Sequence, residues 1–268
     1  MLGAIIGDIV GSRYEFHNIK TKQFELFGDG CYTTDDSIMT TAVAECCLNK
    51  YSHEQIIDTL KKWGQRYPRA GYGGTFLHWV LSNDRMPYYS YGNGAAMRVS
   101  ACGWFGNSEE EVKALSKAVT EVTHDHPEGL KGAEVTAMCV YYARMGKSKK
   151  FIRNYVEQYY DLNFSYEDLR RDYVHADEIC QNTVPQAIFC FLISNSFEDC
   201  LRTTISIGGD CDTTAAISCA IAEAHYHGIP KQIVKQASQY VGRDVAETIK
   251  QCYSALNINW ADYAKYLK

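Results

Sequence analysis

The chain has 268 residues, of which 46% are hydrophobic, and this is enough apolar material for a large buried core. Its formal net charge is -5, with acidic and basic residues interspersed, so the sequence lacks the basic stripe that neutralises a nucleic-acid backbone. We therefore expect no bulk nucleic-acid partner.

The first predicted element is an N-terminal helix with glycine at every fourth position. Gly3, Gly7 and Gly11 form a smooth stripe, although each interior glycine costs about 1 kcal/mol relative to alanine. Such a stripe indicates close backbone packing or room for a ligand. Asp8 and Glu15 are seven residues apart, so both point the same way if the helix continues to residue 15. On this pattern alone, Glu15 is interpreted as a solvated acid at a helix end.

The same N-terminal stretch, MLGAIIGDIVGS, has no basic leading segment, and Asp8 interrupts its apolar run. It therefore predicts neither a signal peptide nor a membrane span. The 11 cysteines lie mostly in apolar helical runs and include no Cys-x-x-Cys pair, which is typical of reduced core cysteines. We expect a soluble, cytoplasmic protein with no membrane partner.

Hydrophobic periodicity predicts helices through nearly the whole remaining chain. Ser52, Ser108 and Ser196 each precede an acidic first turn and are predicted N-caps. No alternating strand pattern competes, and no Pro/Ser-rich linker divides the chain. We therefore predict an all-α fold in one compact domain over residues 1–268. The predicted helices span residues 35–49, 54–66, 109–122, 130–145, 148–160, 182–194, 197–206, 212–227, 230–239 and 244–255.

The segment from Gly71 to Asn107 is the least helical part of the sequence and is rich in glycine and aromatic residues. A long irregular segment inside a compact domain is commonly a binding loop. We expect part of this segment to line a site.

The stretch TTDD at 33–36 comes at the start of the predicted helix 35–49. A threonine cap followed by two acids near the positive end of a helix is common and needs no function. Taken alone, this is the simpler interpretation of Thr34, Asp35 and Asp36.

A second stretch, IGGDCDTT at 207–214, changes that interpretation. Asp210, Asp212 and Thr213 place two carboxylates and a hydroxyl at another helix start, where Gly208 and Gly209 allow an unusual backbone path. Two like charges held together repel each other unless a cation lies between them. The two stretches together offer four carboxylates and two hydroxyls, a hard all-oxygen set that selects Mg, Mn or Ca over Zn. We infer a magnesium site with two ions.

Five motifs, in chain order, resemble the ADP-ribosylglycohydrolases: LGAIIGDIVGSRYEF, TTDDSIMT, GNGAAMR, THDHPEG and IGGDCDTTAAI. The resemblance implies a compact, single-domain, all-α bundle with two Mg²⁺ ions, or Mn²⁺ in some members, at the base of an ADP-ribose cleft. It also implies an enzyme that hydrolyses the bond at C1 of the distal ribose. Its substrate would be an ADP-ribosylated protein or a small-molecule ADP-ribose conjugate.

The resemblance carries over to individual residues. It makes Glu15 a catalytic or metal-gating glutamate, which replaces the interpretation as a solvated acid, and it makes Asp35 or Asp36 the base. It places His124 beside the substrate, in a positioning or structural role. Arg98 is left with two alternatives, a phosphate contact or a local acid. The implied metal ligands are Thr34, Asp35, Asp36, Asp210, Asp212 and Thr213, and the implied diphosphate and ribose loop is Asn93, Gly94, Ala95 and Ala96, which a helix start with free N–H groups suits.

Two other functions fit the same residues. A non-catalytic relative would bind ADP-ribose without cleaving it, but retention of all the ligand types and of Glu15 argues against this. A two-metal phosphohydrolase would cut the diphosphate and release AMP, whereas a glycohydrolase leaves ADP-ribose whole. Among acceptors, the sequence favours arginine mildly, with serine and other conjugates as alternatives.

Overall fold

The structure is a computed structural model that describes residues 1–173, 178–257 and 261–267. Within these ranges every regular element is helical, apart from an isolated β-bridge between Gly92 and Ile179. The predicted all-α fold is confirmed. The elements are α1 (Leu2–Ser12), α2 (Asp35–Asn49), α3 (His53–Arg66), α4 (Gly74–Leu81), α5 (Gly94–Met97), α6 (Ser100–Phe105), α7 (Glu109–Thr120), α8 (Pro127–Arg144), α9 (Lys149–Val156), α10 (Tyr166–Asp172), α11 (Cys180–Ile193), α12 (Phe197–Ile207), α13 (Cys211–His225), α14 (Lys231–Ala237), α15 (Arg243–Leu256) and the 3₁₀ helix η1 (Ala261–Tyr266).

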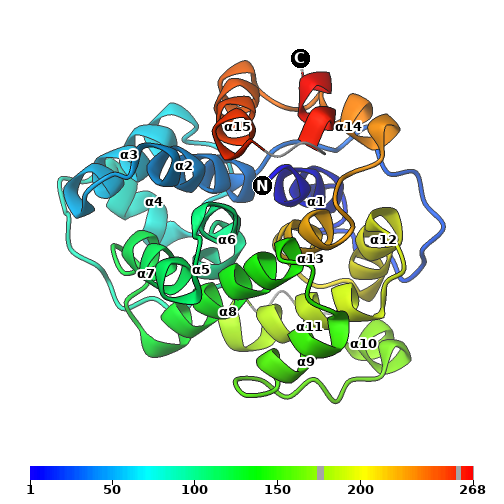
Figure 1. Ribbon diagram of the computed structural model, residues 1–268. Coiled ribbons are helices and arrows are strands. Elements are labelled where there is room, and N and C mark those ends of the chain that lie inside the picture. The colour runs from blue at the N-terminus through cyan, green and yellow to red at the C-terminus, as the bar shows by residue number, and fades with distance from the viewer. Residues whose placement is uncertain (174–177, 258–260, 268) are drawn as a thin grey trace.

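Helices α1 and α13 form the centre of the molecule and lie side by side (Figure 1). Every residue of α1 is buried. The glycine stripe faces α13, since a Cβ on Gly7 would collide with the carbonyl oxygen of Ala215, and one on Gly11 with the backbone of Asp212. Of the two uses that the sequence leaves open for this stripe, the structure shows close backbone packing.

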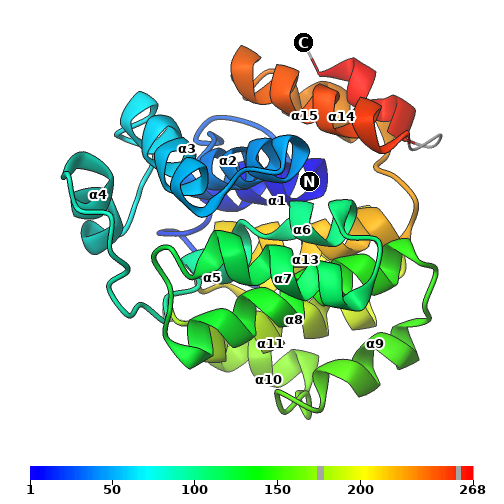
Figure 2. The ribbon, with the colours of Figure 1, turned by 60° about the vertical axis from the view of Figure 1, so that its left-hand side comes forward.

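The other helices cover this central pair on both sides. Figure 2 shows α14 and α15 on one side and α8 and α11 on the other. At the start of α1, the Glu223 carboxylate of α13 accepts from the N–H of Gly3 at 2.8 Å and from the hydroxyl of Tyr253 on α15. It also pairs with the N-terminal ammonium of Met1 at 2.7 Å. The buried carboxylate of Glu223 therefore joins α1, α13 and α15.

The predicted N-caps are confirmed. The hydroxyls of Ser108 and Ser196 accept from backbone N–H groups at the third helical position, and Ser52 forms a capping box with Gln55. Helix α10 was not predicted, and two further expectations differ from the structure. Helix α1 ends at Ser12, so Asp8 and Glu15 do not share a helix.

The second difference is the segment 71–107, which contains α4, α5 and α6 rather than irregular chain throughout. These helices are short, and their glycine and aromatic content hides their periodicity. Trp79 and Trp104 are nevertheless buried by them in the core.

The 11 cysteines are free and buried. In the described part of the chain, no helix is both long and apolar enough to cross a membrane.

Candidate metal centre and cleft

The first acidic turn is held by a carboxylate from the central helix. Thr34 is the N-cap of α2, and its hydroxyl accepts from the N–H of Asp36 at 3.3 Å. Asp8 of α1 lies behind this turn and accepts from the N–H of Thr34 at 3.0 Å, from its hydroxyl at 2.7 Å and from the N–H of Ser37 at 3.1 Å. The Ser37 hydroxyl donates to Asp8 as well. Asp8 is thus the residue that fixes the shape of the turn.

The second acidic turn depends on two glycines. Gly208 and Gly209 have φ values of 78° and 73°, in the left-handed region where a side chain is strained. At Gly209 a Cβ would also collide with the ring of Tyr173. The chain then enters α13, with Asp210 at the N-cap and Asp212 in the first turn.

The two turns meet through their side chains. Thr213 donates its hydroxyl to Oδ2 of Asp36 at 3.1 Å. The carboxylates of Asp8, Asp36 and Asp212 offer oxygens that all lie within 4.8 Å of one another, and so do those of Glu15, Asp210 and Asp212. Asp212 belongs to both groups, so the geometry is that of two adjoining oxygen clusters.

The electrostatics of these clusters favour a cation. Burial, followed by repulsion from neighbouring carboxylates, raises the pKa of Asp36 and Asp210 well above the ordinary value. Burial is also the main cause that raises the pKa of Asp35 and Asp212 to about 8. Oδ1 of Asp36 is buried without a hydrogen-bond partner. An orphaned carboxylate oxygen among like charges is suited to a divalent cation with oxygen ligands.

Three acids occupy positions that the sequence did not fully anticipate. Asp8 was not a predicted ligand, yet it belongs to one cluster. Asp35 was predicted as a ligand, but it belongs to neither close group and lines the cleft instead. Glu15 follows the end of α1, is half-buried, and has its pKa raised to about 7, first by burial and then by Asp210 and Asp35. The interpretation of Glu15 as a solvated acid is therefore wrong.

A cleft of about 570 Å³ opens above the clusters. Much of its lining comes from the segment 71–107, including Gly71–Phe76 and Asn93, so the expectation that part of this segment lines a site is confirmed for the cavity. Glu178, two residues before the start of α11, lines the same cleft. Nothing in the sequence around Glu178 signals this position.

Asn93 ties the cleft to the second acidic turn. Its side-chain N–H₂ donates to Oδ2 of Asp210 at 2.6 Å and to the Thr183 hydroxyl at 3.1 Å. Gly94 lines the cleft with Asn93, whereas Ala95 and Ala96 are buried and donate their N–H groups to the carbonyls of Gly92 and Asn93. The expected free N–H groups are thus absent at these two alanines, because the turn uses them itself.

Arg98 pairs with no acid in the described part of the chain, so that alternative is wrong, whereas it borders the cleft and a phosphate contact stays a prediction. It is 1% exposed, and its Nη2 donates to the Thr123 hydroxyl at 2.7 Å and to the carbonyl of Val119 at 3.2 Å. His124 lines the cleft and is 5% exposed. His126 instead caps α8 and contacts the rings of Tyr89 and Tyr91.

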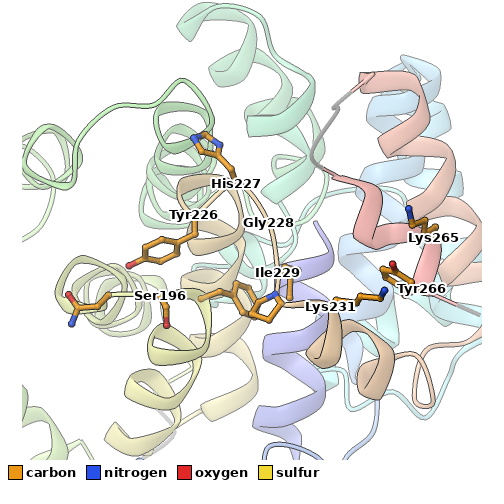
Figure 3. Close-up of a pocket in the computed structure, with 11 residues that line it drawn as sticks. Ser196, Tyr226, His227, Gly228, Ile229, Lys231, Lys265 and Tyr266 are labelled. Atoms are coloured by element: carbon orange, nitrogen blue, oxygen red, sulfur yellow. The ribbon is translucent and has the colours of Figure 1, made fainter.

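A second cavity, of about 530 Å³, lies between the start of α12, the turn after α13, and η1 (Figure 3). Lys231, Lys265 and Tyr266 lie on one side of it and Ser196 and Tyr226 on the other. No carboxylate occurs among its described lining residues, and it shares none of them with the acidic cleft. The chemistry of the acidic clusters is therefore confined to the first cleft.

Comparisons with known proteins agree with this geometry. A family model described as ADP-ribosylglycohydrolase matches residues 1–261. The chain is 26% identical over 305 residues to the ADP-ribosylhydrolase ARH3 of Mus musculus, covering 84% of this chain and 82% of that protein. It is 27% identical over 282 residues to the ADP-ribosyl-[dinitrogen reductase] glycohydrolase of Rhodospirillum rubrum, covering 92% of each. A solved structure described as an ADP-ribosylglycohydrolase-related protein complex shares the fold, with a TM-score of 0.71 at 19% identity, over 96% of this chain and 95% of that chain.

Proposed function

The chain belongs to the ADP-ribosylglycohydrolase family, and we propose that it is a Mg²⁺-dependent hydrolase that removes ADP-ribose from a modified acceptor. The observation that carries this proposal is the pair of carboxylate clusters that share Asp212 at the base of a cleft of about 570 Å³. We also propose that residues 1–268 form a single domain. Arginine is the mildly favoured acceptor.

The residues fit two hard cations. Asp36, Asp210 and Asp212 offer buried carboxylate oxygens, and Glu15 closes one cluster from the side of the cleft. When bound, Mg²⁺ ions, or Mn²⁺, orient sugar hydroxyls and lower the pKa of a nearby water. The proposed ligands are Thr34, Asp35, Asp36, Asp210, Asp212 and Thr213, with Asp8 as the support of the first turn.

The chain's own carboxylates supply the proton chemistry. Cleavage at C1 of a ribose develops positive charge on the sugar, while the leaving atom needs a proton. Without metal, burial and the carboxylates of Asp210 and Asp35 raise the pKa of Glu15 to about 7. Glu15 is therefore the proposed group that guides proton transfer, or that yields its metal position to the substrate. Asp35 or Asp36 is the proposed base. The remaining carboxylates favour the positive charge that develops on the sugar.

The wall formed by the Asn93 loop, beside the second acidic turn, is the proposed binding surface for the diphosphate and ribose. Asn93 and Gly94 face the cleft there, with Ala95 and Ala96 buried behind them. His124 lies beside the same loop. This wall contains few charges, and we assign it to binding rather than to the chemical step.

The decisive experiment uses peptides ADP-ribosylated on arginine or on serine, incubated with the protein in Mg²⁺ or in EDTA, and mass spectrometry of the products. We expect Mg²⁺-dependent release of intact ADP-ribose that is lost in Asp212→Ala and retained in Asp172→Ala, which changes an exposed aspartate. The peptide consumed names the acceptor.

Other products would contradict the proposal. Release of AMP would indicate a phosphohydrolase. Binding of ADP-ribose without release from either peptide would indicate a non-catalytic relative.

A further inference from the structure

Three side chains form a hydrogen-bonded series behind the cleft wall. Nη2 of Arg98 lies 2.7 Å from the hydroxyl oxygen of Thr123, and this oxygen lies 2.8 Å from Nδ1 of His124. Arg98 and Thr123 are fully buried, and both Arg98 and His124 border the cleft. Thr123 therefore links two side chains of the proposed binding wall from behind it.

The direction of these hydrogen bonds follows from what each group can donate. A guanidinium has only donors, so the Thr123 oxygen accepts from Arg98. The hydroxyl then has one proton to donate, and Nδ1 of His124 is its acceptor, since no other acceptor for it is found in the described ranges. If Nδ1 donated instead, the Thr123 proton would be left without a partner in a buried site, which is costly.

The surroundings of His124 favour a neutral ring. Burial, and secondly the charge of Arg98, lower the pKa of His124 well below its ordinary value. A neutral imidazole carries one proton. With Nδ1 as an acceptor, this proton is on Nε2.

Nε2 faces the glycine loop of the cleft. A Cβ built on Gly94 would lie 3.4 Å from Nε2, and one built on Gly92 would lie 3.7 Å from it. The two glycines leave this space open, and we find no hydrogen-bond acceptor for Nε2 within residues 1–173, 178–257 and 261–267. The donor is therefore available to a ligand.

We propose that Arg98 and Thr123 are positioning residues that fix His124 as its neutral Nε2–H tautomer, so that Nε2 donates to an oxygen of an anionic ligand. The identity of that ligand, the diphosphate of ADP-ribose, rests on the proposed function; the tautomer does not. A neutral donor can bind a phosphate oxygen without adding a cation beside two divalent metal ions.

The test reads the tautomer directly. In ¹⁵N-labelled protein without ligand, long-range ¹H–¹⁵N spectra separate protonated from unprotonated imidazole nitrogens, and His124→Gln assigns the signals. We expect protonated Nε2 and unprotonated Nδ1. Thr123→Val leaves Nδ1 without its donor, so it should increase the population of the Nδ1–H tautomer and raise the ADP-ribose dissociation constant about tenfold, since one oriented hydrogen bond is lost. Thr123→Ser should restore both.

Thr120→Val is the matched control, because Thr120 is equally buried on the preceding turn and its hydroxyl has no partner. It should leave the spectrum and the affinity unchanged. A protonated Nδ1 in the wild type, or a Thr123→Val protein with the spectrum and affinity of Thr120→Val, would overturn the inference. Failure of ADP-ribose to bind a protein that shows the expected tautomer would contradict the proposed function and support the tautomer assignment.

Discussion

Asn18 and Gly209 exchange two hydrogen bonds. Oδ1 of Asn18 accepts from the N–H of Gly209 at 2.7 Å, and Nδ2 donates to the Gly209 carbonyl at 2.9 Å. The same Nδ2 lies 2.8 Å from the carbonyl oxygen of Tyr14 and 2.9 Å from that of Glu15, so its two protons are shared among three acceptors. One amide therefore joins the segment that carries Glu15 to the turn that leads into Asp210.

Replacing Asn18 by alanine should weaken metal binding, because both sides of the cluster of Glu15, Asp210 and Asp212 lose their common support. Residues that orient metal ligands typically change affinity by about 10- to 100-fold. Isothermal titration with Mg²⁺ measures this change. Asn49→Ala is the control, since Asn49 is exposed and its side chain donates to the carbonyl of Glu45 one turn earlier. Equal Mg²⁺ affinities in the two variants would show that Asn18 does not organise the cluster.

Replacing Asp212 by asparagine should stabilise the metal-free protein and abolish its response to Mg²⁺. The variant keeps the Oδ1 that accepts from the N–H of Thr213 at 3.0 Å, but above pH 8, where the Asp212 carboxylate has lost its proton, it removes a charge shared by both clusters. Relief of about 1 kcal/mol corresponds to about 3 °C in a chain of this size. Thermal melts in EDTA and in Mg²⁺ test both parts, with Asp172→Asn as an exposed control. A melting temperature of Asp212→Asn that still rises with Mg²⁺ would contradict the assignment of the site.

The stability of the metal-free protein should fall as the pH rises from 6.5 to 8.5. Burial raises the pKa of Asp212 and Asp35 from 3.8 to about 8, and that of Glu15 from 4.5 to about 7. The folded protein thus holds protons that the unfolded chain has already released, and the stabilisation is lost as the pH passes the folded values. Mg²⁺ should remove the effect, because it favours the charged carboxylates.

Denaturant unfolding at several pH values, in EDTA and in Mg²⁺, measures this dependence. Other groups titrate in the same range, so the comparison is between the wild type and Asp212→Asn. A steeper fall in the wild type than in the variant is expected in EDTA alone. Parallel curves would show that Asp212 does not hold a proton in the folded protein.

Most of the helices could be predicted because their signals are local. The range predicted for α2 is the observed one, and the caps at Ser108 and Ser196 are visible in a few residues of sequence. Helices α4, α5 and α6 could not be predicted in this way, because glycine and aromatic residues obscure their pattern. Burial of Trp79 and Trp104 against distant helices stabilises them, and this information is not local.

In the candidate site, too, the residues in local motifs could be predicted and those that depend on distant contacts could not. Both acidic turns are contiguous motifs, so their residues were predicted from the sequence. Asp8 was missed as a partner of the cluster because its role appears only when residues 34–37 fold over α1. Thr123 was missed for a similar reason. Its hydroxyl accepts a hydrogen bond from Arg98, which lies 25 residues earlier in the chain.

Replacing Gly7 by alanine should destabilise the whole fold, because α1 and α13 are in backbone contact at the centre of the molecule. Separation of these helices would also remove the support that α1 gives to the first acidic turn. The new Cβ would collide with the carbonyl of Ala215, a backbone atom in the middle of a buried helix that cannot move away cheaply. Overpacking outweighs the gain of about 1 kcal/mol in helix propensity, so the free energy of unfolding should fall by about 2 kcal/mol.

Gly74→Ala is the matched control, since a Cβ there meets nothing within 4 Å at the start of a helix, and it should be neutral or slightly stabilising. Urea unfolding in EDTA measures both variants without any contribution from metal binding. If Gly7→Ala were as stable as Gly74→Ala, the glycine stripe would not be needed for the contact between α1 and α13, and the spacing of Gly3, Gly7 and Gly11 would require another explanation.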